Sequence, residues 1–229
     1  MEIKKAGIVV LLMICSTHIH SQTVVQPDYG LKSHETLTIS KIVLTPEKTV
    51  ISLAIENRLT GGAFCADKNI WLMDSEGARL KLKKATGIPQ CPESYKFKMI
   101  GEKLQFTLEF PPLKTGTKWV DLIEECSDNC FSFYGVTLDV DLNSKIDEAL
   151  SIAENGEILR AITLYKKIVE SLPSSENGIK GALYTDIITL SLETGDKAGA
   201  EEWYRKMVLS EAPRLQLYVK NLNSRGIKF

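Results

Sequence analysis

The chain has 229 residues and a formal net charge of −1, with 44% hydrophobic and 25% charged residues. These values are ordinary for a globular protein and exclude a disordered or collagen-like chain. A nearly neutral chain also lacks the basic face that nucleic-acid-binding proteins use, so we expect no nucleic-acid partner. The length allows one large domain or two small ones.

The first 21 residues resemble a secretory signal peptide. A charged stretch, residues 1–5, precedes an apolar run, residues 6–15, and a polar stretch that ends at Ser21. The run is too short to span a bilayer. We therefore expect cleavage after Ser21, a periplasmic or extracellular protein, and no transmembrane segment in the mature chain. Gln22 would then begin the mature protein, as in many exported proteins of Gram-negative bacteria. Lipidation at Cys15 is the less favoured alternative, because Ile14 stands where a bacterial lipobox carries a small residue.

Four cysteines follow this segment: Cys65, Cys91, Cys126 and Cys130. An even number of cysteines in an exported chain indicates disulfides. Of the three possible pairings we favour the one that joins neighbours in sequence, 65 with 91 and 126 with 130. A zinc site is the weaker alternative, because the paired C-x-x-C spacing of structural sites is missing and an oxidising compartment disfavours thiolates.

Between residues 37 and 139 the apolar residues recur with a period of two, which predicts strands with one buried face. The expected strands are 37–44, 49–57, 70–73, 78–84, 95–99, 103–110, 118–124 and 131–139. Asp74 to Gly77 form the expected turn of a hairpin. Many short strands separated by turn signals predict an antiparallel β-sandwich domain over residues 22–142. Trp71 and Trp119 fall inside expected strands, so we expect both in the core.

From residue 143 the apolar period changes to 3.6, which predicts an α-helical domain over residues 143–229. Ser144 and Asp147 resemble a capping box that starts the first helix. The first and third helices are expected at about residues 144–154 and 179–193, and apolar stripes at 158–169 and 200–207 predict the second and fourth. A fifth helix is expected at 214–222.

Two stretches of this helical part resemble the tetratricopeptide repeat, a helix–turn–helix unit of about 34 residues. The family has a glycine at the turn, then an alanine, an aromatic residue and a proline at set spacings. The matching residues are Gly156, Ala161, Tyr165 and Pro173, and then Gly195, Ala200, Tyr204 and Pro213. The resemblance implies two repeats, about five extra residues near 174–178, and a capping helix after them. A plain helical bundle packed on the sandwich is the alternative.

The β part is similar, more loosely, to immunoglobulin-like domains of exported bacterial proteins. The likeness rests on the strand that ends at residues 55–57, the hairpin around residues 74–77 and the strand that follows Gly101. The expected architecture is therefore multi-domain: an antiparallel immunoglobulin-like β-sandwich followed by a small helical array like the tetratricopeptide repeat. This likeness brings no functional residues with it.

Few residues in the chain are suited to catalysis. His34 is the only histidine beyond the expected signal peptide, and G-x-S-x-G, H-E-x-x-H and phosphate-loop motifs are missing. We expect a solvated histidine, no enzyme activity, no cofactor and no metal. The acids near Cys126 are expected to form a solvated turn rather than a calcium site; they are Asp121, Glu124, Glu125 and Asp128.

A pair of repeats presents the first helix of each unit on its inner side, where partners of such arrays bind. The non-core positions of these helices predict a polar protein-binding face: Lys145, Glu148, Ser151, Thr185, Asp186 and Thr189. We therefore expect a non-catalytic, secreted or periplasmic protein that binds or scaffolds other proteins in a Gram-negative envelope. The alternative is a carbohydrate-binding or carbohydrate-processing protein that uses carboxylates of the sandwich.

Overall fold

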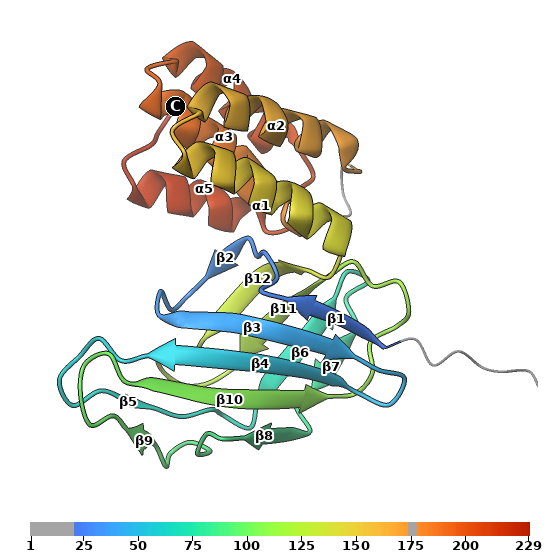
Figure 1. The fold of residues 1–229 in the computed structure, drawn as a ribbon, viewed down its shortest axis with the longest axis vertical. Helices are drawn as coiled ribbons and strands as arrows, with labels where there is room; N and C mark the ends of the chain where they lie inside the picture. The colour runs from blue at the N-terminus through green and yellow to red at the C-terminus, as the bar shows by residue number, and fades with distance from the viewer. Residues whose placement is uncertain (1–20, 174–177) are drawn as a thin grey trace, which may run out of the picture.

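The computed structural model describes residues 21–173 and 178–229. The expected signal sequence up to residue 20, with Cys15, lies outside the described residues, as do residues 174–177 of the insertion expected at 174–178. Over the described residues, antiparallel sheets are followed by five helices (Figure 1). The predicted order, a β-sandwich and then a helical part, is therefore confirmed.

Two five-stranded sheets face each other. The first has the order β1 (Gln22–Val25), β3 (Leu37–Leu44), β4 (Thr49–Glu56), β10 (Lys103–Phe110) and β8 (Lys84–Thr86). The second has the order β2 (Leu31–Lys32), β12 (Ser132–Thr137), β11 (Trp119–Glu124), β6 (Ile70–Asp74) and β7 (Arg79–Lys81). A short pair, β5 (Ala63–Phe64) and β9 (Tyr95–Lys96), lies beside them. The strand expected at 95–99 is thus only two residues long, because the chain turns away at Phe97.

Every second side chain of β4 and β10 points into the space between the two sheets. Ile51 pairs with Leu108 and Leu53 with Phe106, and none of the four is more than 3% exposed. Burial of each such side chain contributes about 1.5–3 kcal/mol before the entropy of ordering is counted. The facing layer comes from the second sheet, with Ile70, Leu72, Leu122, Phe133 and Val136 in the same cluster.

Only one of the two tryptophans expected in the core is buried, and it lies against Gly178 of the helical part rather than between the sheets. Trp119 is 7% exposed, whereas Trp71 lies on the outer face of β6. The Arg79 guanidinium carbon is 4.3 Å from the Trp71 ring centroid, and the indole Nε1 donates to Glu125 at 2.9 Å. The outward position follows from the period of two, because Ile70 and Leu72 on either side point into the core.

The five helices are α1 (Val140–Glu154), α2 (Ile158–Ser171), α3 (Lys180–Glu193), α4 (Lys197–Leu209) and α5 (Leu215–Ser224). The first begins four residues earlier than expected, so the capping box at Ser144 is wrong. Asp139 caps α1 instead, with its carboxylate accepting the N–H groups of Asp141 and Leu142. The expected boundary at 142/143 therefore falls inside α1.

Each helix packs against the next in an antiparallel succession. Gly156 and Gly195 end α1 and α3 with φ of +83° and +79°, a conformation that glycine adopts without a steric penalty. Ala161 and Ala200 are both fully buried. The small side chains let α2 and α4 approach their partner helices closely.

The helical part is docked on β12 and on the segment around β2 (Figure 1). The Asp28 main-chain N–H donates to Asn143 Oδ1 at 2.9 Å, and Gly30 lies so close to Tyr218 of α5 that a Cβ on it would collide with the Tyr218 hydroxyl. A Cβ placed on Gly135 of β12 would lie 2.3 Å from the Gly178 carbonyl oxygen. Two glycines thus let the main chains of the two parts touch.

Candidate functional site

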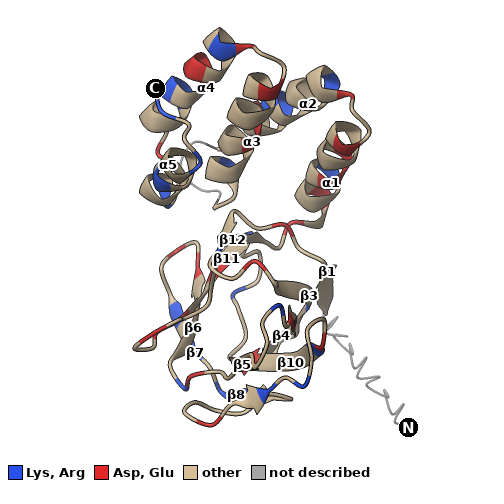
Figure 2. Cartoon of the chain, turned by 90° about the vertical axis from the view of Figure 1, so that its left-hand side faces the viewer, with Lys and Arg blue, Asp and Glu red and all other residues tan. Residues whose placement is uncertain are grey.

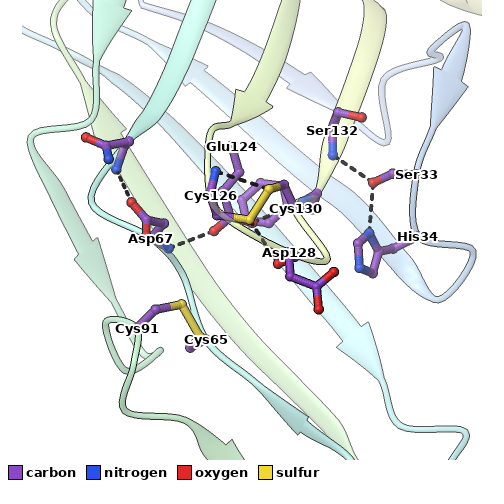
Figure 3. Close-up of a disulfide and its surroundings, with 12 residues drawn as sticks. Ser33, His34, Cys65, Asp67, Cys91, Glu124, Cys126, Asp128, Cys130 and Ser132 are labelled. Carbon is purple, nitrogen blue, oxygen red and sulfur yellow. Dashed lines mark hydrogen bonds between the residues drawn. A yellow bond between two sulfur atoms is a disulfide. The ribbon is translucent and has the colours of Figure 1, made fainter.

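Both disulfides form as the favoured pairing predicts. Cys65 is bonded to Cys91 and Cys126 to Cys130, with S–S distances of 2.07 and 2.02 Å (Figure 3). This pairing leaves none of the four thiols to bind zinc. The two bridges lie at the same end of the sandwich, where loops from both sheets meet.

A pocket of about 440 Å³ opens between the two disulfides. Phe64, Asp67, Glu124 and Asp128 are among its lining residues. Both oxygens of Glu124 are already engaged: Oε1 accepts the Asp67 N–H at 2.7 Å and Oε2 the Phe131 N–H at 3.0 Å (Figure 3). Burial raises the pKa of Glu124 above its usual value, and these two hydrogen bonds oppose the rise. A carboxylate held in this way joins two loops and is poorly placed for proton transfer.

The four acids near Cys126 do not form one solvated turn, so that expectation is wrong. Asp121 is 1% exposed and accepts the Gly135 N–H at 2.7 Å. Glu124 is also buried, whereas Glu125 lies outside against Trp71 and Arg79. The described part of the chain has no group of three or more histidine, cysteine and acidic residues arranged to hold a metal ion.

His34 contacts a serine but lacks the third member of a catalytic triad. Ser33 Oγ is 2.8 Å from His34 Nδ1, and the same hydroxyl accepts the Ser132 N–H at 2.8 Å (Figure 3). The other ring nitrogen, Nε2, is buried and has no hydrogen-bond partner, while the ring packs edge-on against Phe64. A triad needs an acid on that second nitrogen to orient the base. The ring is half-buried, so the expectation of a freely solvated histidine is wrong.

The structure divides the predicted protein-binding residues. Thr185 is 7% exposed and its hydroxyl donates to the Gly181 carbonyl at 3.0 Å, so its assignment to a binding face is wrong. Asp186 and Thr189 lie together on the less buried side of α3. Lys145 and Glu148 are exposed on α1 but point elsewhere. Successive helical residues are about 100° apart. Lys145 and Glu148 therefore lie about 160° and 100° around the helix from Asp147, the α1 residue whose charge acts on Asp28.

Three carboxylates from separate segments gather at the inner side of the helices: Asp28 before β2, Asp147 on α1 and Asp186 on α3. We call them the acidic face. Burial, together with the charges of Asp147 and Asp186, raises the pKa of Asp28 to about 7. Burial also raises the pKa of Asp186 to about 6, and the positive charge of Arg225 opposes that rise. Figure 2 shows acidic residues on both α1 and α3.

Two polar atoms at the acidic face have no partner. Asp28 Oδ2 and Thr189 Oγ1 are both buried without a hydrogen bond. The Tyr165 side chain of α2 lies close enough that Asp186 and Asp28 help burial to raise its pKa. A buried polar atom without a partner is costly, so a ligand that supplied hydrogen-bond donors would be favoured here.

Sequence reasoning missed Asp28 and gave Asp147 a different role. Asp28 belongs to no motif, and its contact with Asn143 spans 115 residues of sequence. Asp147 was assigned to a capping box, although it shares a helical face with Asn143. The helical period of α1 places Asn143 and Asp147 on the same face. Asp28 reaches this face only because the segment between β1 and β2 docks on α1.

Comparisons with protein-family models, curated proteins and solved structures found no match for this chain. Among the described residues, no helix has both the length and the apolar character needed to span a bilayer. The two disulfides are compatible with an exported protein.

Proposed function

We propose that this is a non-catalytic, exported protein that binds or scaffolds other proteins in a Gram-negative envelope, and that its acidic face takes a basic segment of the partner. The observation that carries the proposal is the convergence of Asp28, Asp147 and Asp186. Burial raises the pKa values of Asp28 and Asp186, and the charges of Asp147 and Asp186 add to the rise at Asp28. A lysine or arginine side chain would let them ionise and would donate to Asp28 Oδ2.

The proposed architecture supports this role. In this proposal the helical part is a two-unit array similar to the tetratricopeptide repeat, capped by α5, and the sandwich is immunoglobulin-like. Buried Ala161 and Ala200 and the left-handed turns at Gly156 and Gly195 suit such units. Arrays of this kind bind partners with the inner faces of their first helices, which are α1 and α3 here.

No described feature favours the carbohydrate alternative in the same way. Glu124 is engaged by two main-chain amides, and Asp121 by Arg214 and the Gly135 N–H. On the outer face of the second sheet, Trp71 is covered by the guanidinium of Arg79 and Tyr134 by that of Arg214. The sandwich therefore offers no pair of free, converging carboxylates among the acids that the sequence singled out.

The test uses a labelled hexalysine peptide as the probe and a hexaglutamate peptide for comparison. We expect binding of hexalysine only, stronger as the pH rises through about 6–7, where the raised carboxyls ionise. The double variant Asp147→Asn/Asp186→Asn should weaken binding by about tenfold or more, since it removes two attractive charges. Glu148→Gln is the matched control, because it removes a carboxylate on another side of α1 and should leave affinity nearly unchanged.

The natural partner is sought by a pull-down from envelope extract with the wild type and the double variant in parallel. A protein that co-purifies with the wild type and is lost with the double variant supports the proposal. Equal binding of both peptides, or hexalysine binding that Glu148→Gln weakens as much as the double variant, would overturn the assignment to the acidic face.

A further inference from the structure

Two loops at one end of the sandwich carry exposed apolar side chains. Residues 57–62 connect β4 to β5, and residues 97–102 connect β9 to β10, well apart from the helices in Figure 1. Leu59, Met99 and Ile100 are 70%, 67% and 60% exposed. Single exposed apolar residues are ordinary, but three on adjoining loops form one patch, which we call the apolar tip.

The two loops are bonded to each other. Asn57 is 5% exposed, and its side-chain amide donates to the Met99 carbonyl at 2.8 Å. The Gly101 N–H donates to the Asn57 carbonyl at 2.8 Å, and the Phe97 N–H to the Gly62 carbonyl at 2.9 Å. These bonds hold the apolar side chains as a single protrusion above the sandwich core.

Most of the exposed charges around the apolar tip are basic. Glu56 is bridged by Arg58 and Lys103 at 3.2 and 3.4 Å, and its side chain is only 29% exposed. Glu102 accepts the Tyr95 hydroxyl at 2.6 Å and the Lys98 N–H at 2.5 Å. Glu35 is exposed on a neighbouring loop. The exposed basic side chains form a rim: Arg58, Lys96, Lys98 and Lys103.

We propose that the apolar tip inserts into the headgroup region of an anionic lipid bilayer while the basic rim contacts the lipid phosphates. Shallow insertion of a few apolar side chains, joined to cations that attract anionic lipid, is sufficient for peripheral binding. The long lysine stems lie along apolar surface and keep their charges at the headgroups. The apolar side chains at the tip are too few for a stable protein interface, which takes about 20–30 residues from each partner.

Membrane docking goes beyond the proposed protein binding and rests on different residues. The apolar tip belongs to loops of the sandwich, whereas the acidic face lies among α1, α3 and the segment before β2. A protein with both surfaces would hold its partner close to a membrane. Either surface can fail its test without affecting the other.

The test uses protein recovered from the periplasm of an expressing bacterium, with its N-terminus fixed by mass spectrometry. The probes are vesicles of equal parts phosphatidylglycerol and phosphatidylcholine, compared with vesicles of phosphatidylcholine alone. We expect co-sedimentation with the anionic vesicles that weakens with salt. The variant Leu59→Ser/Met99→Ser/Ile100→Ser should lower partitioning at least about tenfold. Leu209→Ser is the matched control, because Leu209 is 85% exposed at the end of α4 and should not contribute.

Insertion is read directly from Ile100→Trp with lipids brominated on their acyl chains. We expect added quenching in anionic vesicles relative to the wild type, and weaker binding when Lys98→Glu and Lys103→Glu are introduced. Asp147→Asn/Asp186→Asn should leave vesicle binding intact. Lack of binding by the wild type, no added quenching, or equal effects of the triple variant and Leu209→Ser would overturn the proposal. A triple variant that loses a protein partner but keeps vesicle binding would assign the tip to protein recognition instead.

Discussion

Arg214, at the start of α5, holds the buried carboxylate of Asp121 in β11. Its Nη2 and Nε lie 2.8 and 3.0 Å from Asp121 Oδ2. The Asp121 side chain is 1% exposed and that of Arg214 39%. The pair spans 93 residues of sequence and joins the last helix to the sandwich.

Replacing Arg214 with methionine should lower the free energy of unfolding by about 2–4 kcal/mol. The change leaves the carboxylate of Asp121 buried with the Gly135 N–H as a donor but without its cationic partner, and an uncompensated buried charge is strongly destabilising. Urea denaturation measures the loss. Arg160→Met is the control, because Arg160 pairs with Glu157 on the exposed surface of α2 and should cost less than about 1 kcal/mol. Equal losses in the two variants would show that the Arg214 pair contributes no more than a surface pair.

Gly135→Ala should destabilise the junction between the two parts. Gly135 has a φ of +65°, and a Cβ there would also lie 2.3 Å from the Gly178 carbonyl oxygen. Gly77→Ala is the matched control, since Gly77 has a φ of +84° and open space around it. Both variants place an alanine at a positive φ and bear that conformational cost. The collision with Gly178 should therefore lower the stability of Gly135→Ala by about 2 kcal/mol or more beyond that of Gly77→Ala. Thermal unfolding of the two variants checks this difference.

Loss of the two disulfides should lower the free energy of unfolding by unequal amounts. The bond from Cys65 to Cys91 closes a separation of 26 residues and that from Cys126 to Cys130 one of 4. On the chain-entropy account the longer loop stabilises by about 3.5 kcal/mol and the shorter by about 2. We expect Cys65→Ala/Cys91→Ala to lower stability more than Cys126→Ala/Cys130→Ala. Thiol titration of the denatured, unreduced protein should find none of these four cysteines free.

Stability should fall as the pH rises through the weakly acidic range because of the acidic face. The pKa of Asp28 is raised from 3.8 to about 7, so the folded state binds this proton more tightly than the unfolded state. The stabilisation is complete below about pH 4 and is lost as the pH approaches 7. Asp28→Asn mimics the protonated form and should raise stability near pH 8 by about 1–3 kcal/mol, with little gain near pH 4.

Denaturation at both pH values checks this sign. Glu148→Gln is the control, since Glu148 is exposed on α1 and should change stability little at either pH. A gain from Asp28→Asn that is equal near pH 4 and near pH 8 would contradict the proton linkage.

The elements themselves were largely predictable, because their signals are local. The period of two located β3 and β10 at their observed bounds, and the period of 3.6 located the five helices. The start of α1 was missed by four residues, because Ser144 and Asp147 resemble a capping box, whereas Asp139 caps the helix. Trp71 was misplaced because strand membership alone does not say which face a residue occupies.

The sequence by itself determined the strand and helix segments, the disulfide pairing between neighbouring cysteines, and the buried small residues at the helix turns. Each of these depends on residues close together in the chain. Only the tertiary structure decided that Asp28 lies within the electrostatic influence of Asp186, that Arg214 reaches Asp121, and that Thr185 is buried. Asp28 and Asp186 are 158 positions apart in the sequence, and Asp121 and Arg214 are 93 apart. They depend on how whole elements pack against each other. Packing is set by the combined shapes of many side chains, and the local periodicity of the sequence does not specify it.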